Sequence, residues 1–168
     1  HHPIYSAKSK SNNLFQRWAF ADLLNANVDL VLQGHEHAYA RMTQWEDGKR
    51  VPPVYTVSHC SPKFYRIHFD ERFDRYGTGR QIYQHIAVHG DTLSMNAYDA
   101  RTGKLYDRVD VVKGFHDNPT IIDRAKGIPE ILDFTPQPGN KKDAAFAERI
   151  RAYKAQKGLQ PKSVNRPL

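Results

Sequence analysis

Apolar positions in the first part of the chain change their spacing at residue 28, and each pattern predicts a different element. The stretch 12–27 is expected to form a helix, with capping residues at 11–13 and a stop at 25–27. Apolar side chains recur there near one helical face: Leu14, Phe15, Trp18, Ala21 and Leu24. The following run VDLVLQG, residues 28–34, is nearly continuous in apolar residues and predicts a buried strand. A helix followed directly by such a strand is typical of α/β architecture.

The pattern after residue 46 favours strands and turns. Residues 46–53, EDGKRVPP, predict a turn-rich connector, and 54–59, VYTVSH, predict a strand. Residues 61–80 are long, aromatic and charged, which favours an ordered loop. Residues 81–113 alternate between apolar and polar positions around the turn signals HGD and RTG, so they predict a β-meander.

The last third of the chain has a different character. Proline and glycine interrupt residues 114–140 irregularly, which predicts a strap laid over the surface. Residues 141–158 are good helix formers with sparse apolar positions, so they predict a surface helix. We therefore expect a mixed α/β (α+β) fold with a unit over 1–113 and a helical or irregular extension over 114–168.

Composition narrows the class of protein. A chain of 168 residues fits one ordinary domain, and no stretch approaches the ~20 apolar residues of a membrane span. The single cysteine excludes an internal disulfide and a zinc cage of several cysteines. Residues 139–168 hold eight of the Lys and Arg residues and two acidic residues, and so carry +6 of the net charge of +7.

Two histidines follow the predicted strand 28–34 in the sequence GHEH. In an extended backbone His35 and His37 would point to the same side, about 6–7 Å apart, which suits a bent loop or two neighbouring metal ions. Gly34 lets the backbone bend and approach a ligand, and Glu36 would face away, so we do not assign it as a ligand. Such a pair also occurs by chance in solvated loops.

A second histidine pair opens the sequence as HHPIYS. Pro3 keeps His2 out of the helical region, so the stretch is typical of a loop at a strand end. If a preceding strand lies beside 28–34, His1 and His35 leave the same edge of one sheet, which is where open α/β sheets bind ligands. His59 is a further candidate near such a cleft, whereas His85 and His89 are expected to be structural.

Three stretches in this order carry a resemblance to a known family: HHPIYS, VDLVLQGHEHAYAR and PPVYTVSHCSPK. The first two are similar to the last metal-binding blocks of the calcineurin-like metallophosphoesterases. The purple acid phosphatase-like branch is the most similar, because its members carry H-x-P-x-Y and G-H-x-H-x-Y-x-R. The resemblance covers residues 1–113, and the G-H-x-H block in this context is fairly specific.

The resemblance implies roles for single residues. His1 and His35 match ligands of a second, divalent metal, and His37 matches a ligand of the first metal, an iron ion. His2 lies where the family varies, so we expect it on the substrate side or facing solvent. Three residues complete the block as supports of the site: Gly34, Tyr39 and Arg41. The implied cofactors are two metal ions, iron paired with zinc, manganese or a second iron.

The family's fold is a four-layer αββα sandwich, and this chain would supply its C-terminal half. The blocks of the first half, which bring the bridging aspartate, an asparagine ligand and a catalytic histidine, have no counterpart here. Catalytic residues are therefore expected upstream. Two ions held close need a bridging carboxylate, and three neutral histidines could bind one zinc or nickel ion only weakly. We expect the chain alone to be inactive.

The resemblance thus implies a fragment of a secreted or periplasmic phosphomonoesterase or phosphodiesterase. Its partners would be a phosphoester substrate and the missing N-terminal half of the same domain. The alternative is a non-catalytic binding module on the same scaffold, with the basic tail docking a partner. Nucleic acid is not expected as a partner, since only Phe146 and Tyr153 interleave the charges of residues 139–168, too few for a base-stacking platform.

Overall fold

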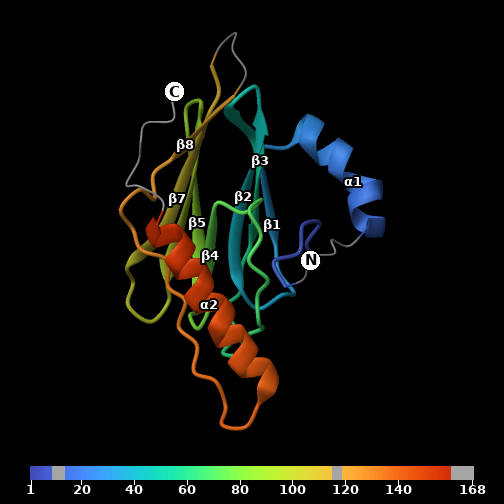
Figure 1. Ribbon diagram of the computed structural model, residues 1–168. Helices are drawn as coiled ribbons and strands as arrows, with labels where there is room; N and C mark the ends of the chain where they lie inside the picture. Colours follow the sequence, from blue (N-terminus) through green and yellow to red (C-terminus); the bar gives the residue numbers. More distant parts are fainter. Residues whose placement is uncertain (9–13, 115–118, 160–168) are drawn as a thin grey trace.

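The computed structural model describes residues 1–8, 14–114 and 119–159, and it forms two four-stranded sheets and two helices (Figure 1). In chain order the elements are α1 (Leu14–Asn27), β1 (Leu30–Gln33), β2 (Tyr39–Glu46), β3 (Lys49–Val57), β4 (Arg75–Gly77), β5 (Ile82–His89), β6 (Thr92–Asp99), β7 (Leu105–Val112), β8 (Thr120–Asp123) and α2 (Lys141–Leu159). The expectation of a mixed α/β fold is confirmed.

The first sheet is mixed and has the strand order β1-β3-β2-β4. Strand β1 pairs in parallel with β3, and β2 pairs antiparallel with both β3 and β4. Asp47 and Gly48, both with positive φ, close the two-residue turn of the β2–β3 hairpin. The chain reaches β3 from β1 through β2, which runs opposite to both strands, so β1 and β3 are parallel.

The second sheet is the antiparallel meander β5-β6-β7-β8. Its first three strands confirm the meander predicted for 81–113, and the turns lie at the two predicted signals, where Gly90 and Gly103 have positive φ. The fourth strand, β8, pairs with β7 and comes from the segment for which we predicted an irregular strap. The short run of Thr120, Ile121 and Ile122 was the available signal.

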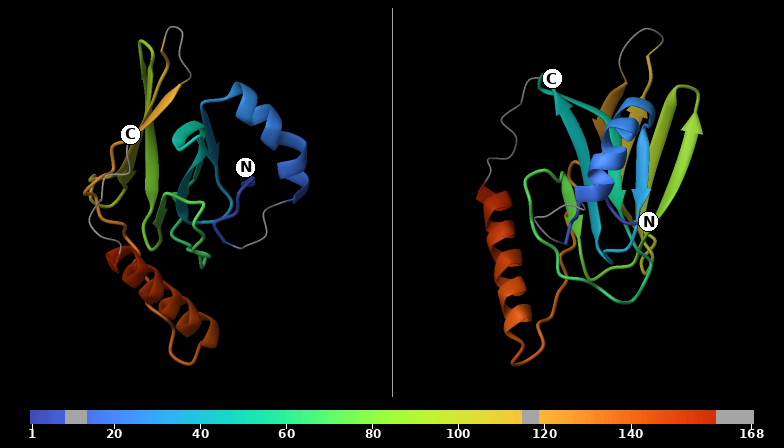
Figure 2. Two further views of the ribbon diagram at one scale, coloured as in Figure 1. Left: turned by 45° about the horizontal axis from the view of Figure 1, so that its top comes forward. Right: turned by 90° about the vertical axis from the view of Figure 1, so that its right-hand side faces the viewer.

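The two sheets pack face to face, and α1 lies on the outer side of the first sheet (Figure 2). Val54 of β3 packs between the sheets against side chains of the meander, among them Met95, Val109 and Val111. The opposite face of the first sheet forms a second core, with Met42 of β2 among its members. Strands β2 and β3 are therefore buried on both faces.

Helix α1 confirms the predicted element, but its apolar face is largely uncovered. Trp18 is 82% exposed, and Leu14 and Phe15 are each 71% exposed. Only Ala21 is buried, and Asn25 anchors the C-terminal half by accepting a hydrogen bond from the hydroxyl of Tyr55, at 2.8 Å. Periodicity identified the helix correctly but could not say what covers its apolar face.

Strand β1 is not the buried strand that the apolar run predicted. Its residues are half-buried except for Leu32, which is 52% exposed. The reason is its position: β1 lies at the edge of the sheet and pairs only with β3 within the described residues. An apolar strand at an open edge is an unusual arrangement for a parallel pair.

Two expectations for the middle of the chain were incomplete. Residues 46–53 are part of the β2–β3 hairpin and not only a connector. The strands can pair there although they contain Pro52 and Pro53, because the two prolines lie where the register shifts, opposite Thr43 and Gln44. Residues at such a bulge are not paired, so no hydrogen bond between the strands requires the backbone N–H that proline lacks. Residues 61–80 are mostly an ordered loop, as predicted, and add the short edge strand β4.

Helix α2 confirms the predicted helix but is more than a surface element. Phe146 is fully buried, and Ile150 is buried beside it, in the same core cluster as Met42 and Tyr76 of the first sheet. Ala145, one of the sparse apolar residues of 141–158, is exposed. The division between 1–113 and 114–168 stays a prediction. No helix in the described ranges is long and apolar enough to cross a membrane.

A buried ion network joins the two sheets. The guanidinium of Arg41 on β2, only 1% exposed, donates from Nε to Asp107 on β7 at 2.8 Å and from Nη2 to Asp123, the last residue of β8, at 2.8 Å. Asp74 lies 3.4 Å from its Nη1, and the hydroxyl of Tyr39 donates to Asp107 at 2.7 Å. Burial alone would lower the pKa of Arg41, but the carboxylates raise it by more than burial lowers it. The guanidinium therefore stays charged.

The replacement Asp107→Asn should therefore destabilise the fold strongly. It removes the counter-charge of Arg41 that is itself fully buried, so we expect the free energy of unfolding to fall by about 3–5 kcal/mol. Urea unfolding followed by circular dichroism measures this. The matched control is Asp133→Asn, which removes an exposed ion pair with Arg80 and should cost at most about 1 kcal/mol. Equal losses in the two variants would contradict a structural role for the buried network.

Candidate metal centre

The GHEH loop begins where β1 ends and lies against the first residues of the chain. The backbone N–H of Gly34 donates to the carbonyl of His1 at 2.9 Å, and the side-chain amide of Gln33 donates to the carbonyl of His2 at 3.2 Å. His35 has φ 68° and His37 has φ 45°, so the loop is sharply bent rather than extended. The bent loop, not a strand, decides where each imidazole points.

Three imidazoles meet at this end of β1. The ring centroids of His1 and His35 are 5.4 Å apart, those of His2 and His35 are 3.8 Å apart, and those of His1 and His2 are 5.3 Å apart. All three side chains are exposed. The structure therefore brings together His1 and His35, as expected from strands ending at one edge, and adds His2, which lies even closer to His35.

His37 has different neighbours. Its ring stacks on Tyr65 at 4.7 Å and on His59 at 5.6 Å, and among the described residues no ring contact joins it to His1, His2 or His35. Its Nδ1 lies 3.0 Å from the carbonyl oxygen of Lys63. A carbonyl only accepts, so the proton is assigned to Nδ1, which leaves Nε2 with a free lone pair for a ligand.

Glu36 fixes the loop from inside. It is buried, and its carboxylate accepts hydrogen bonds from the hydroxyl of Ser6, from the backbone N–H of Ala7 at 2.6 Å and from that of Lys8 at 3.1 Å. The carboxylate thus holds the segment that carries His1 and His2 against the loop that carries His35. This agrees with the expectation that Glu36 faces away from its neighbours, and it gives the residue a positioning role.

The supporting residues differ in what they do. Tyr39 and Arg41 point into the core between the sheets and hold strand β2, at the C-terminal end of the loop. A Cβ added to Gly34 would lie 3.5 Å from the His1 ring, an ordinary contact, so the geometry leaves room for alanine there. Gly34 therefore allows His1 to come close without being sterically required.

The loop 58–65 contributes residues that the sequence reasoning had assigned no role. The ammonium groups of Lys8 and Lys63 lie 4.6 Å and 5.0 Å from the ring centre of Tyr65, which itself stacks on His37. Neither lysine has a carboxylate partner within the described residues. Two cations therefore lie against the ring on which His37 stacks. His59 was considered only as a candidate near the cleft, and the structure places it beside His37.

Imidazole nitrogens are good donors for zinc, nickel and iron. Within residues 1–8, 14–114 and 119–159, however, no group of three or more His, Cys, Asp and Glu side chains is arranged to hold a metal ion. The rings of His1 and His35 meet edge to face, at 80°. This chain therefore offers part of a donor set, and a binuclear centre would need carboxylate oxygens in addition.

No protein-family model matches the chain, and no curated protein or solved structure is significantly similar to it. The resemblance to metallophosphoesterases therefore depends on the motifs in residues 1–63 and on the site itself. Function is a matter for proposal.

Replacing Glu36 with alanine should release the first residues from the loop. The change leaves the backbone N–H of Ala7 buried without an acceptor, which we expect to cost about 1–3 kcal/mol of unfolding free energy. Faster amide hydrogen exchange at Ala7 would accompany this loss. Glu46→Ala, at the exposed end of β2, serves as the control. If hydrogen exchange at Ala7 is unchanged by Glu36→Ala, the carboxylate does not hold this segment.

His59 should make the stability depend on pH. Both ring nitrogens are buried and have no hydrogen-bond partner in the described part of the chain. Burial, assisted by His37, lowers the pKa of His59 to about 4. The unfolded chain therefore binds a proton that the folded chain excludes, and the free energy of unfolding should fall as the pH drops from about 6.5 toward about 4.

Urea unfolding of wild type and His59→Gln over this pH range tests the assignment. The variant should lose less stability on acidification than the wild type, whereas His89→Gln, at an exposed position of β5, should behave as the wild type. Parallel pH profiles for wild type and His59→Gln would show that His59 is not the group responsible.

Proposed function

We propose that this chain is the C-terminal portion of the catalytic domain of a metal-dependent phosphoester hydrolase, with a binuclear metal centre. The observation that carries the proposal is the meeting of His1 and His35, 30 residues or more apart in sequence, with rings 5.4 Å apart at the C-terminal end of β1. Their residue types, order and spacing are those of the H-x-P and G-H-x-H blocks. A chance pair of loop histidines predicts no such meeting.

The open edge of the first sheet supports the proposal that the domain is larger than this chain. Strand β1 is apolar, parallel and at an edge, and Leu32 is exposed on it. The neighbouring helix α1 exposes Trp18 and Phe15. Parallel strands are normally covered and flanked on both sides. An N-terminal half carrying further strands beside β1 would cover these groups and complete a four-layer αββα sandwich.

Each histidine has a role in this proposal. His1 and His35 would hold the divalent ion, and Nε2 of His37 would hold the iron. The two ions would supply the electrostatic stabilisation of developing charge that phosphoryl transfer requires. Carboxylates that bridge the ions would come from the N-terminal half. His2, adjacent to His35, would face a phosphomonoester or phosphodiester substrate. By its resemblance the parent protein would be secreted or periplasmic.

The Glu36 carboxylate matters to this chemistry because it makes the donor geometry rigid. Metal sites need their ligands held in place by surrounding hydrogen bonds. Here Glu36 joins the two histidine-bearing segments, and the Lys63 carbonyl orients the His37 ring. Both contacts lie within this chain. The histidine ligands of the proposed site are therefore held in place without the carboxylates of the proposed N-terminal half.

The test uses a longer protein that includes the sequence preceding His1. It should bind about two metal ions per chain and hydrolyse p-nitrophenyl phosphate or bis-p-nitrophenyl phosphate, whereas residues 1–168 should not. In that longer protein His35→Ala should lower the hydrolysis rate by at least about a hundredfold and reduce the metal content. The matched control His89→Ala, an exposed histidine of the second sheet, should leave both unchanged.

A folded longer protein that binds no metal and hydrolyses neither ester would contradict the proposal. That outcome would favour the alternative, a non-catalytic binding module on the same scaffold. Metal content that is equal in wild type and His35→Ala would remove the ligand assignment even if hydrolysis were observed.

A further inference from the structure

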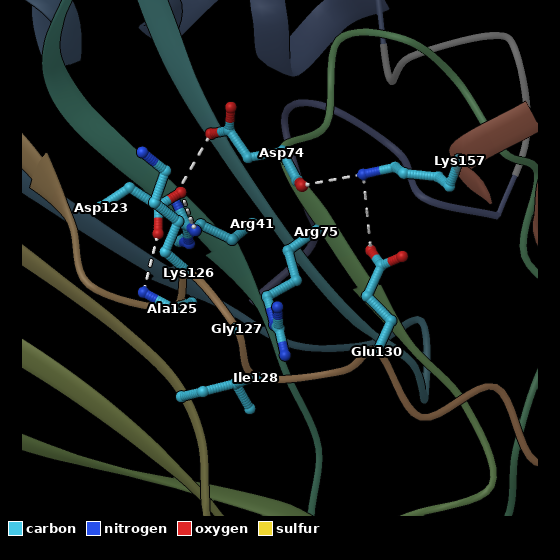
Figure 3. A pocket seen from close by; sticks show the side chains of 10 residues that line it. All are labelled: Arg41, Asp74, Arg75, Asp123, Ala125, Lys126, Gly127, Ile128, Glu130 and Lys157. Atoms are coloured by element: carbon cyan, nitrogen blue, oxygen red, sulfur yellow. Dashed lines mark hydrogen bonds and ion pairs between the residues drawn. The ribbon is translucent and has the colours of Figure 1, made fainter. Parts of the chain in front are cut away.

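A cavity of about 370 Å³ lies between strand β4, the segment after β8 and the last turns of α2 (Figure 3). No histidine of the described ranges lines it. In Figure 3, Arg41, Asp123 and Lys126 lie on one side and Glu130 and Lys157 on the other, with Arg75 between them. The volume is at the lower end of the range for small-molecule sites.

The acidic side chains of the cavity already have cationic or hydrogen-bonding partners. Asp123 accepts from both Arg41 and Arg50 at 2.8 Å, and these two guanidinium groups overcome the effect of burial and hold its pKa well below the usual range. Asp74 pairs with Arg50 at 3.0 Å. Glu130 accepts from the backbone N–H of Tyr76 at 2.7 Å. The carboxylates are therefore committed to the fold.

The cationic side chains of the cavity have fewer hydrogen bonds and ion pairs than the carboxylates. Arg75 is 6% exposed, and only its Nη2 donates hydrogen bonds, to the carbonyls of Tyr106 at 2.7 Å and Pro129 at 3.0 Å. Its Nε is buried without a hydrogen-bond partner, 3.9 Å from Asp107, and Nη1 forms no hydrogen bond or ion pair with any described residue. The guanidinium also lies 4.7 Å from the ring centre of Tyr106, a cation–π contact that leaves Nη1 available as a donor. Lys126 also forms no ion pair with any described residue. Lys157 has only long contacts, 4.0 Å to the carboxylate of Glu130 and 3.5 Å to the backbone carbonyl of Asp74.

Buried charge without hydrogen-bonded partners is costly, and a guanidinium donor that faces a cavity is a preferred ligand for an oxyanion. Three cationic groups from different segments line the same space. The carboxylates of Asp74, Asp123 and Glu130 line it too, but their short contacts are with other groups: Arg50, Arg41 and the backbone N–H of Tyr76. We propose that this cavity binds a small organic phosphate, whose phosphate group is held by Arg75 Nη1 and by the ammonium groups of Lys126 and Lys157. The remaining volume accommodates a few carbon atoms beside Ile128.

This site is separate from the proposed hydrolase centre and does not depend on it. Its anchors come from β4, from the segment that follows β8 and from α2, whereas the histidines come from the first residues and from the loop after β1. Occupation would tie α2 and the segment after β8 to the first sheet. The bound phosphate would therefore stabilise the folded chain and would not be a substrate.

The experiment is a titration of the chain with glycerol 3-phosphate and, separately, with inorganic phosphate, followed by calorimetry and by backbone amide NMR. We expect saturable binding, tighter for glycerol 3-phosphate, with shifts at the amides of Ala125, Lys126 and Gly127. Lys126→Ala should weaken binding about tenfold. Lys104→Ala, which removes an exposed lysine from the β6–β7 turn, should bind as the wild type.

Three outcomes would overturn the proposal: no saturable binding at millimolar concentration, equal weakening by Lys126→Ala and Lys104→Ala, or amide shifts confined to the histidine loop. Because both lysines are exposed, neither variant should lose its fold, which circular dichroism verifies. Lys157→Gln gives a second, independent measurement and should also weaken binding. Hydrolase activity is not used, so the proposed function can fail while this proposal stands.

Discussion

The ion pair between Arg41 and Asp107 is the interaction on which the rest of the structure depends. One partner comes from β2 in the first sheet and the other from β7 in the second, and both are almost fully buried. A guanidinium cannot remain in such a place without a carboxylate, so the sheets can pack only where the two meet. Tyr39, whose pKa is raised by burial and by Asp107, stays a neutral donor to the same carboxylate.

The stretch 34–41, which ends at Arg41, also carries two histidines of the candidate site, His35 and His37. Positive φ at His35 and His37 turns their rings outward, while Glu36 turns inward to the first residues of the chain. The stretch is thus anchored twice, at Glu36 and at Arg41, and it carries the exposed imidazole of His35 and the half-buried imidazole of His37. Such anchoring restricts where the rings can go, and rigid placement is what a metal site needs from its surroundings.

The sequence was a good guide where the signal was local. Gly90 and Gly103 marked the meander turns, and the residues near Ala21 marked α1. It failed where burial depends on a distant partner: the periodicity of α1 could not reveal that Trp18 has no cover, and the contact of His59 with His37 requires the folded loop 58–65. Pro52 and Pro53 concealed a hairpin because a bulge tolerates them.

The central claim is that the imidazoles of His1 and His35 share one edge of the first sheet. Nuclear Overhauser effects between histidine ring protons, measured on the chain with assigned histidines, test it most directly. The account predicts cross-peaks among His1, His2 and His35, and between His37 and Tyr65. A spectrum in which the His35 ring has no cross-peak to either of the first two residues would contradict it.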